Sequence, residues 1–179
     1  AYGTIKEGRK LFVQAPTGIG KTISTIFPSV KALGEGKVSR LFYLTAKTIT
    51  RSVAEEAFLR LREKGLRLKV VTLTAKDKLC FCPGEGCTPE SCPYADRHFD
   101  RVNDAIFDLI TSEDSFTREI IEKYAEKHRV CPFEFSLDIA LFSDCIICDY
   151  NYAFDPRVYL KRFFLEGASN ESYVFLVDE

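Results

Sequence analysis

Residues 15–22 read Ala15-Pro16-Thr17-Gly18-Ile19-Gly20-Lys21-Thr22. A mostly apolar run at 10–14 precedes them, and the residues from Ile23 to Val30 have the composition of a helix. A strand, a glycine-bearing loop that ends in Gly-Lys-Thr, and a helix together form the context of a phosphate-binding loop. We therefore predict a strand at about 10–14, a phosphate-binding loop at 15–22 and a helix that begins near Lys21.

The residue types of this loop suit a nucleotide triphosphate. Inward-turned backbone N–H groups and the helix N-terminus provide partial positive charge for phosphate oxygens, and Gly18 and Gly20 permit the required backbone angles. We expect Lys21 to reach the β- and γ-phosphates and the Thr22 hydroxyl to bind Mg²⁺. Ala15 stands where the first glycine is usual, and a small residue is tolerated there. The alternative is a chance turn before a helix.

The composition of the chain is that of a water-soluble globular protein. It has 179 residues, 46% of them hydrophobic and 28% charged, with a net charge of −1, so any surface for nucleic acid has to be local. The sequence contains no apolar run of membrane-spanning length and no signal peptide, which predicts a cytoplasmic protein that does not contact a membrane. Both ends fall close to predicted motifs, so we expect a fragment of a longer protein.

Short apolar runs alternate with helical patterns along the chain, which predicts the α/β class with a parallel sheet. From about residue 80 this alternation stops, and it resumes only after about residue 131, so we expect an insertion between strands. The expected strands after the first are at 38–44, 68–73, 145–148 and 173–178, and the expected later helices are at about 53–61, 93–111, 116–128 and 133–142.

The last predicted strand ends in two carboxylates, Asp178 and Glu179. A strand of this kind downstream of a phosphate-binding loop usually places its aspartate beside Mg²⁺, and the adjacent glutamate can accept a proton from the attacking water. An exposed acidic strand end is the alternative. Together with the loop, this pair predicts a RecA-like ATP hydrolase.

Seven cysteines in a cytosolic chain indicate metal binding or catalysis before disulfides. Cys80, Cys87, Cys92 and Cys131 are separated by six, four and thirty-eight residues. Four thiolates suit tetrahedral zinc or an iron–sulfur cluster, and the spacing favours iron–sulfur only slightly. Cys82 competes with Cys80 for the first position.

Four further residues have side chains that can bind metals, but their positions in the sequence favour other roles. Cys145 and Cys148 lie in an apolar strand, where positions i and i+3 face opposite sides, so we predict that both are core residues. We predict that His98 and His128, each alone on a helix, are surface residues and not ligands.

The order of these motifs resembles that of the XPD/DinG-like iron–sulfur DNA helicases of superfamily two. The resemblance covers the chain from about residue 10 to its end. It is carried by the loop at 15–22, by Tyr43-Leu44-Thr45-Ala46-Lys47-Thr48, by Lys78-Leu79-Cys80, by Cys131-Pro132-Phe133, by Asp149-Tyr150-Asn151-Tyr152-Ala153-Phe154-Asp155-Pro156 and by the final Asp178-Glu179.

The resemblance implies a set of ligands and roles. It implies a 4Fe–4S cluster on Cys80, Cys87, Cys92 and Cys131, ATP on the loop with Lys21 at its phosphates, Mg²⁺ at Thr22 and Asp178, and water activation by Glu179. It also implies 5′-to-3′ movement on single-stranded DNA and action at junctions of single- and double-stranded DNA. The segment 43–48 is similar to a family motif that contacts the single-strand backbone.

The resemblance also divides the chain. The motor domain would occupy 1–79 and 132–179, and the cluster insertion 80–131. Shorter spacing among the first three cysteines and the additional Cys82 depart from the eukaryotic members and indicate a bacterial-type branch. Because the second motor domain is absent from the sequence, we expect this fragment to be inactive alone.

Residues 60–78 and the start of the next helix are candidate DNA contacts. Seven cations face two acids in 60–78, which fits phosphate contacts or a solvated helix face. Tyr94, His98, Phe99 and Arg101 could supply stacking and a cation beside a strand-separating wedge, or could pack in the core.

Two other function classes remain open. One is a phosphate-loop ATPase with a zinc-stabilised insertion that acts on RNA or protein, and the other is a non-catalytic cysteine-rich binding module. A helicase relative with an appended nuclease is a further possibility. The presence of Lys21, Thr22, Asp178 and Glu179 together argues against a degenerate scaffold.

Overall fold

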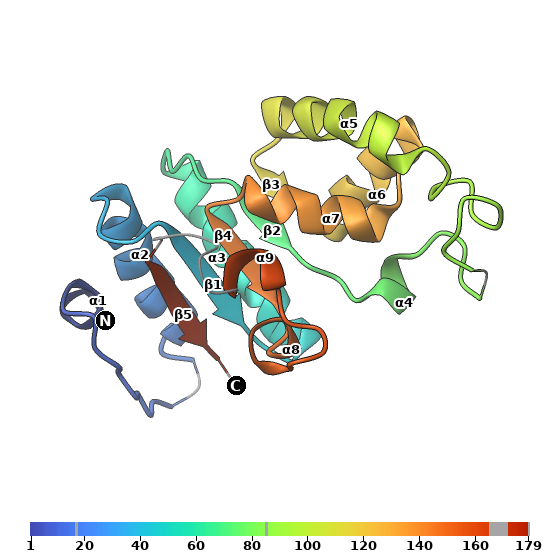
Figure 1. The fold of residues 1–179 in the computed structure, drawn as a ribbon. Coiled ribbons are helices and arrows are strands. Elements are labelled where there is room, and N and C mark those ends of the chain that lie inside the picture. The colour runs from blue at the N-terminus through green and yellow to red at the C-terminus, as the bar shows by residue number, and fades with distance from the viewer. Residues whose placement is uncertain (17, 85, 165–171, 179) are drawn as a thin grey trace. The chain divides into compact units, whose positions relative to one another are not determined.

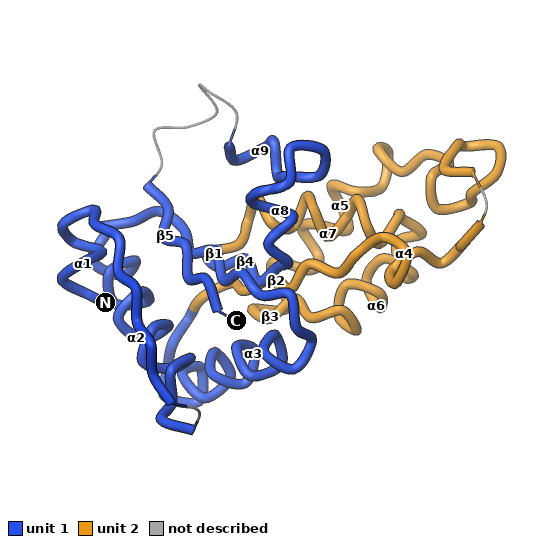
Figure 2. Tube along the Cα trace, turned by 90° about the horizontal axis from the view of Figure 1, so that it is seen from below, with its two compact units in different colours: residues 1–67, 144–179 blue, residues 68–143 orange. Residues whose placement is uncertain are grey.

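A computed structural model describes residues 1–16, 18–84, 86–164 and 172–178 (Figure 1). These residues form two compact units, each with its own buried core (Figure 2). Unit 1 comprises residues 1–67 and 144–179, and unit 2 comprises residues 68–143. The segment 80–131, predicted to be a cluster insertion, lies within unit 2. That this segment binds a cluster stays a prediction.

Unit 1 is built on parallel strands. β1 (Arg40–Leu44) lies between β4 (Cys145–Cys148) and β5 (Tyr173–Val177), with Leu41 opposite Cys145 and Val174 in the two registers. β1 and β4 consist almost entirely of buried side chains, as expected of central strands in a parallel sheet. The predicted α/β class is therefore confirmed.

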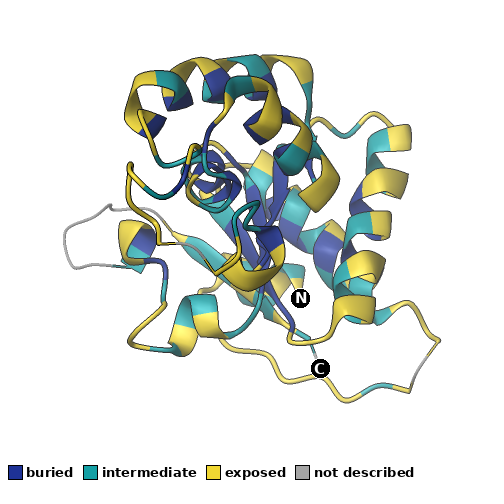
Figure 3. Cartoon of the chain, turned by 90° about the vertical axis from the view of Figure 1, so that its right-hand side faces the viewer, coloured by how far each residue is buried: buried dark blue, intermediate teal, exposed yellow. Residues whose placement is uncertain are grey.

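The two longest helices of unit 1, α2 (Lys21–Gly34) and α3 (Thr48–Glu63), bury one face and expose the other. Helices that are dark blue on one side and yellow on the other are visible in Figure 3. In α2, for example, Ile26, Ser29 and Ala32 are buried at helical spacing. The helices of unit 1 are α1 (Tyr2–Lys6), α2 (Lys21–Gly34), α3 (Thr48–Glu63), α8 (Asn151–Phe154) and α9 (Lys161–Phe164).

Unit 2 is mainly helical. Its strands β2 (Val70–Thr72) and β3 (Ser115–Phe116) pair in parallel, with Val71 opposite Phe116. No helix or strand occurs in the described residues from 81 to 97, where the chain runs through turns and bends. The helices are α4 (Lys76–Leu79), α5 (His98–Ser112), α6 (Arg118–His128) and α7 (Pro132–Leu141).

Most predicted elements are present, with shifted boundaries. α3 begins at Thr48 and not near residue 53, and α5 begins at His98 and not near 93. The helices α1, α4, α8 and α9 and the strand β3 were not predicted, because segments of two to five residues carry too little periodicity. None of the helices in the described part of the chain is long and apolar enough to cross a bilayer.

The predicted strand at 10–14 is wrong. Residues 9–16 form neither helix nor strand, and the side chains of Leu11, Phe12 and Val13 are 51%, 92% and 64% exposed. A strand exists only through backbone hydrogen bonds to a neighbour, and no strand of the described residues pairs with this segment. An apolar run in the sequence cannot report whether such a neighbour is present.

Candidate functional site

The phosphate-binding loop leads into the first turn of α2, as predicted. Gly18 and Gly20 adopt φ angles of +84° and +78°, the left-handed region that favours glycine, and Gly20 is the N-cap of α2. The fourteen-residue α2 then begins at Lys21, so its free N–H groups face the loop. Thr17 lies outside the described residues.

Lys21 spans the loop. Its ammonium Nζ donates a hydrogen bond to the carbonyl oxygen of Ala15 at 3.1 Å, so the two ends of the loop are joined by the residue predicted to bind phosphate. The other described loop residues, including Pro16 and Ile19, are largely exposed. A compact loop with an exposed rim and a central cation can accept an anionic group.

Asp178 lies directly beyond the carboxyl end of β5. Its backbone N–H donates to the carbonyl of Leu44 at 3.0 Å, which extends the pairing of β5 with β1 by one bond. Two tyrosine hydroxyls donate to it: Tyr43 to the carboxylate Oδ2 and Tyr150 to the backbone carbonyl. These bonds hold both the side chain and the backbone of the predicted magnesium ligand. Glu179 lies outside the described residues.

Tyr43 holds the carboxylate of Asp178. Its hydroxyl donates a hydrogen bond to Oδ2 of that residue. The side chain of Tyr43 is 1% exposed, and this burial, followed by the bond to Asp178, raises the pKa of the phenol well above its usual value of 10.0. The phenol is therefore a permanent donor to the carboxylate at any physiological pH.

Sequence reasoning missed the role of Tyr43. A signal was present, because Tyr43 is the polar-tipped residue in the otherwise apolar run Leu41–Leu44. A buried tyrosine hydroxyl needs a hydrogen-bond partner, and the nearest polar groups to a parallel strand's end are those at the same sheet edge.

Two cavities in unit 1 adjoin these residues. One, of about 270 Å³, is lined by Thr45, Ala46, Lys47, Tyr150 and Asp178 at the carboxyl ends of the strands. This is where open α/β sheets usually bind ligands. The second cavity, of about 210 Å³, lies between the start of α2 and the middle of α3. Its lining residues are Gly20, Thr22, Ile23, Val53, Glu56, Ala57 and Arg60.

Hard oxygen donors dominate the strand-end site. A threonine hydroxyl and an aspartate carboxylate are ligands that Mg²⁺ accepts together with phosphate oxygens and water. The chemistry of Thr22 and Asp178 therefore fits a magnesium ion that also binds a nucleotide.

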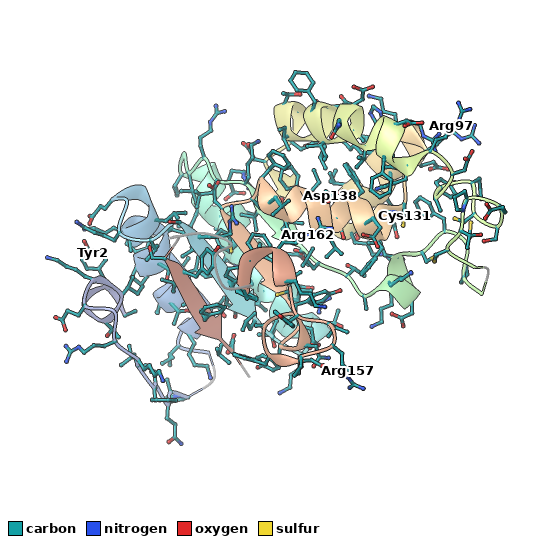
Figure 4. All side chains as sticks on the ribbon, in the orientation of Figure 1. Tyr2, Arg97, Cys131, Asp138, Arg157 and Arg162 are labelled. Atoms are coloured by element: carbon teal, nitrogen blue, oxygen red, sulfur yellow. The ribbon has the colours of Figure 1, made fainter. Side chains whose placement is uncertain are left out.

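The four predicted cluster cysteines all belong to unit 2. Cys80 follows α4, Cys87 and Cys92 lie in the turn-rich segment, and Cys131 is the N-cap of α7. In Figure 4 Cys131 lies at the end of α7 that faces this segment. Among the described residues no three His, Cys, Asp or Glu side chains are grouped as a metal site would require.

Weaker relationships still connect three of these thiols. Lys76 lies near Cys87, which raises the pKa of its ammonium, and Cys80 lies near enough to Cys131 to contribute to the raised pKa of that thiol. Burial raises the pKa of the Cys131 thiol. The donor set is chemically suited to a soft metal or cluster. Cys82 is half-buried like Cys80, so the burial of these two thiols does not decide between them.

Cys145 and Cys148 lie in β4 and are completely buried, which confirms that they are core residues. Burial raises the pKa of Cys148 to about 12 and that of Cys145 well above its usual value. Neither thiol is therefore available as a thiolate at neutral pH.

The prediction that His98 is a surface residue is wrong. Its side chain is 4% exposed, and its Nδ1 accepts a hydrogen bond from the backbone N–H of Cys131 at 3.2 Å. Burial lowers the pKa of the imidazole. The error arose because the first turn of α5 packs on the start of α7, a contact between segments thirty-three residues apart.

Two candidate DNA-contacting cations have structural partners instead. Lys69 donates from Nζ to the carbonyls of Ile110 and Glu113 at 2.6 and 3.2 Å. Arg101 donates to the carbonyl oxygens of Asp96 and Arg129. Both side chains therefore hold loop ends of unit 2 together.

Comparisons with known proteins agree with this architecture. The DEAD_2 family matches residues 44–179, and the DEAD/DEAH box helicase family matches residues 1–79. A solved structure described as an XPD helicase superimposes on 99% of the chain with a TM-score of 0.63 at 16% sequence identity. The chain spans 30% of the length of that structure. A match over most of the chain assigns it to a family of helicases: the chain belongs to the DEAD_2 family.

Proposed function

We propose that this chain is the first motor domain of an ATP-dependent DNA helicase, in which ATP hydrolysis drives 5′-to-3′ movement on single-stranded DNA and separation of a duplex. The observation that carries the proposal is that one unit contains both a glycine-bearing loop that caps α2 and an aspartate, Asp178, fixed at the carboxyl end of β5. Membership of the DEAD_2 family supports the use of ATP and Mg²⁺.

In the proposed site the chain's own residues bind and orient the nucleotide. The N–H groups of the loop and the first turn of α2 would bind the phosphates, and Lys21 would exchange its bond to Ala15 for a phosphate oxygen. Thr22 and Asp178 would hold Mg²⁺, which supplies charge neutralisation at the phosphates when bound. Glu179 would accept the proton of the attacking water.

Single-stranded DNA is the proposed track. Lys47 and the backbone that begins α3 lie at the strand-end cavity, and α3 carries no acidic residue in its first turn, which suits a phosphate group of the DNA backbone. In unit 2 Phe99 is 84% exposed at the start of α5, and its neighbour Arg97 is exposed and points into solvent (Figure 4). An exposed ring is suited to stacking on an unpaired base, and a cation two residues away in the sequence is suited to a phosphate group.

We also propose that Cys80, Cys87, Cys92 and Cys131 hold a 4Fe–4S cluster. The family resemblance and the nearness of Lys76 to Cys87 and Cys131 support this assignment. When bound, the cluster would crosslink the turn-rich segment to the start of α7, a region with little core of its own. Metal analysis of anaerobically purified protein tests this. About four irons and four sulfides per chain support it, whereas one zinc without sulfide overturns it and favours the ATPase with a zinc insertion.

Nucleotide binding tests the core of the proposal. Lys21→Ala should lower the affinity for ATP and abolish its hydrolysis, because the variant removes the charge at the centre of the loop. Lys31→Ala is the matched control, since Lys31 lies on the same helix, is 54% exposed and interacts at the surface with Glu35 and the ring of Tyr2. Equal ATP binding by both variants would contradict the proposal.

A second experiment identifies the nucleic acid along which the protein moves. We expect single-stranded DNA to stimulate ATP hydrolysis by the complete protein more than single-stranded RNA of the same sequence. Duplexes with a 5′ overhang should be unwound, and those with a 3′ overhang should not. Stimulation of ATP hydrolysis by RNA and not by DNA would contradict the proposed DNA helicase and support the alternative, an ATPase that acts on RNA.

A further inference from the structure

Tyr43 occupies a position that neither the loop motif nor the strand-end motif includes. It lies in the middle of β1, between β4 and β5, and its hydroxyl reaches the carboxyl edge of these strands. The backbone at this point is paired on both sides, so the ring has little freedom to move. The hydroxyl is therefore fixed in space by the sheet itself.

The hydrogen-bond acceptor of the Tyr43 hydroxyl is a proposed protein ligand of Mg²⁺. The Tyr43 hydroxyl has one proton, and that proton goes to Oδ2 of Asp178. Tyr150 donates to the backbone carbonyl of the same residue. Asp178 is therefore held at both its side chain and its backbone.

The bond from Tyr43 has a chemical consequence at Asp178. It fixes Oδ2, and the other carboxylate oxygen is the one left for the metal or its water.

We infer that Tyr43 is a positioning residue for magnesium, which orients the carboxylate of Asp178 through its single hydroxyl before nucleotide binds. The inference rests on the proposed function and deepens it. Outer-sphere groups of this kind fix the orientation of metal ligands, and their removal typically lowers metal affinity by about 10- to 100-fold.

Tyr43→Phe tests the inference, since it removes the hydroxyl and keeps the buried ring. Binding of a fluorescent ATP analogue is measured in EDTA and against increasing Mg²⁺, and binding of Mn²⁺ is followed by electron paramagnetic resonance. We expect unchanged affinity in EDTA and a half-saturating Mg²⁺ concentration about tenfold higher than in the wild type. Tyr124→Phe, the same change at a buried tyrosine of unit 2, should bind Mg²⁺ like the wild type.

A double-mutant cycle separates positioning from general destabilisation. If Tyr43 acts through Asp178, the loss of Mn²⁺ affinity in Asp178→Asn with Tyr43→Phe should be smaller than the product of the two single losses. Additive losses, or a Mg²⁺ titration of Tyr43→Phe that superimposes on the wild type, would overturn the inference. A wild-type protein whose nucleotide binding does not respond to Mg²⁺ would instead overturn the proposed function.

Discussion

Nε2 of His128 lies 2.7 Å from Oδ2 of Asp108, so the last turn of α6 is tied to the exposed side of α5. The same oxygen accepts a hydrogen bond from Lys127 at 2.6 Å. A cationic side chain in the last turn also interacts favourably with the C-terminal end of the helix. His128 was predicted to be a surface residue, and it is a half-buried partner of a carboxylate.

The bonds to Asp108 predict a pH dependence of stability. The bonds from Lys127 and then His128 lower the pKa of this carboxyl below its usual value of 3.8. The stabilisation is therefore present above pH 3.8 and lost as the pH falls through the lower folded-state pKa. We expect Asp108→Asn to lower the melting temperature at pH 7 and to have no effect at the acid end, measured by circular dichroism. A difference of equal size at pH 7 and pH 3 would contradict this origin.

Gly20→Ala should weaken nucleotide binding. The φ angle of +78° costs an L-residue about 1–2 kcal/mol, whereas the added Cβ itself would make an ordinary contact, 3.4 Å from Cγ2 of Ile23. Gly34→Ala is the control, because Gly34 has ordinary angles, has open space around it and ends the same helix. We expect a several-fold loss of affinity for an ATP analogue in the first variant and none in the second. Equal affinities would show that the loop tolerates a Cβ.

Serine substitutions should separate Cys80 from Cys82. We predict that Cys80→Ser loses most of the iron of anaerobically purified protein, because serine replaces a thiolate of the proposed cluster. Cys82→Ser should retain it, and both changes are made in half-buried thiols two residues apart. Iron and sulfide analysis with the visible spectrum provides the measurement. The opposite result would transfer the ligand role to Cys82.

Phe99→Ala should lower the affinity for single-stranded DNA. Loss of a stacked base costs about 1–3 kcal/mol, and the exposed ring makes only an edge contact with His98 among the ring contacts of the described residues. Phe107→Ala, at a ring that is 68% exposed further along α5, is the matched control. Fluorescence anisotropy with a labelled oligonucleotide gives both affinities. Similar losses in both variants would exclude a specific stack at Phe99.

Phe42→Ala should destabilise unit 1 strongly. The ring is fully buried in β1 and contacts Phe163, Phe164, Tyr173 and Phe175 with centroid distances of 5.2 to 5.6 Å. Truncation of such a phenylalanine costs about 3–5 kcal/mol. Phe175→Ala should cost less, because that ring is 42% exposed. Urea denaturation measures both, and equal losses would show that burial does not set the difference.

The sequence by itself determined the features that depend on local pattern. The glycines and Lys21 identified the loop, because positive φ angles and a helix start require particular residues at fixed spacing. Apolar runs identified β1, β4 and β5, because buried parallel strands have no polar face. The site residues on the loop and at Asp178 followed from these elements.

Tertiary structure alone decided the relationships between distant segments. No local pattern indicates that Tyr43 bonds to Asp178, 135 residues away, or that His98 is buried against Cys131. Likewise the apolar run at 10–14 could not reveal that it lacks a strand partner among the described residues. Strand pairing and burial depend on which surfaces meet, and that information is distributed over the whole chain.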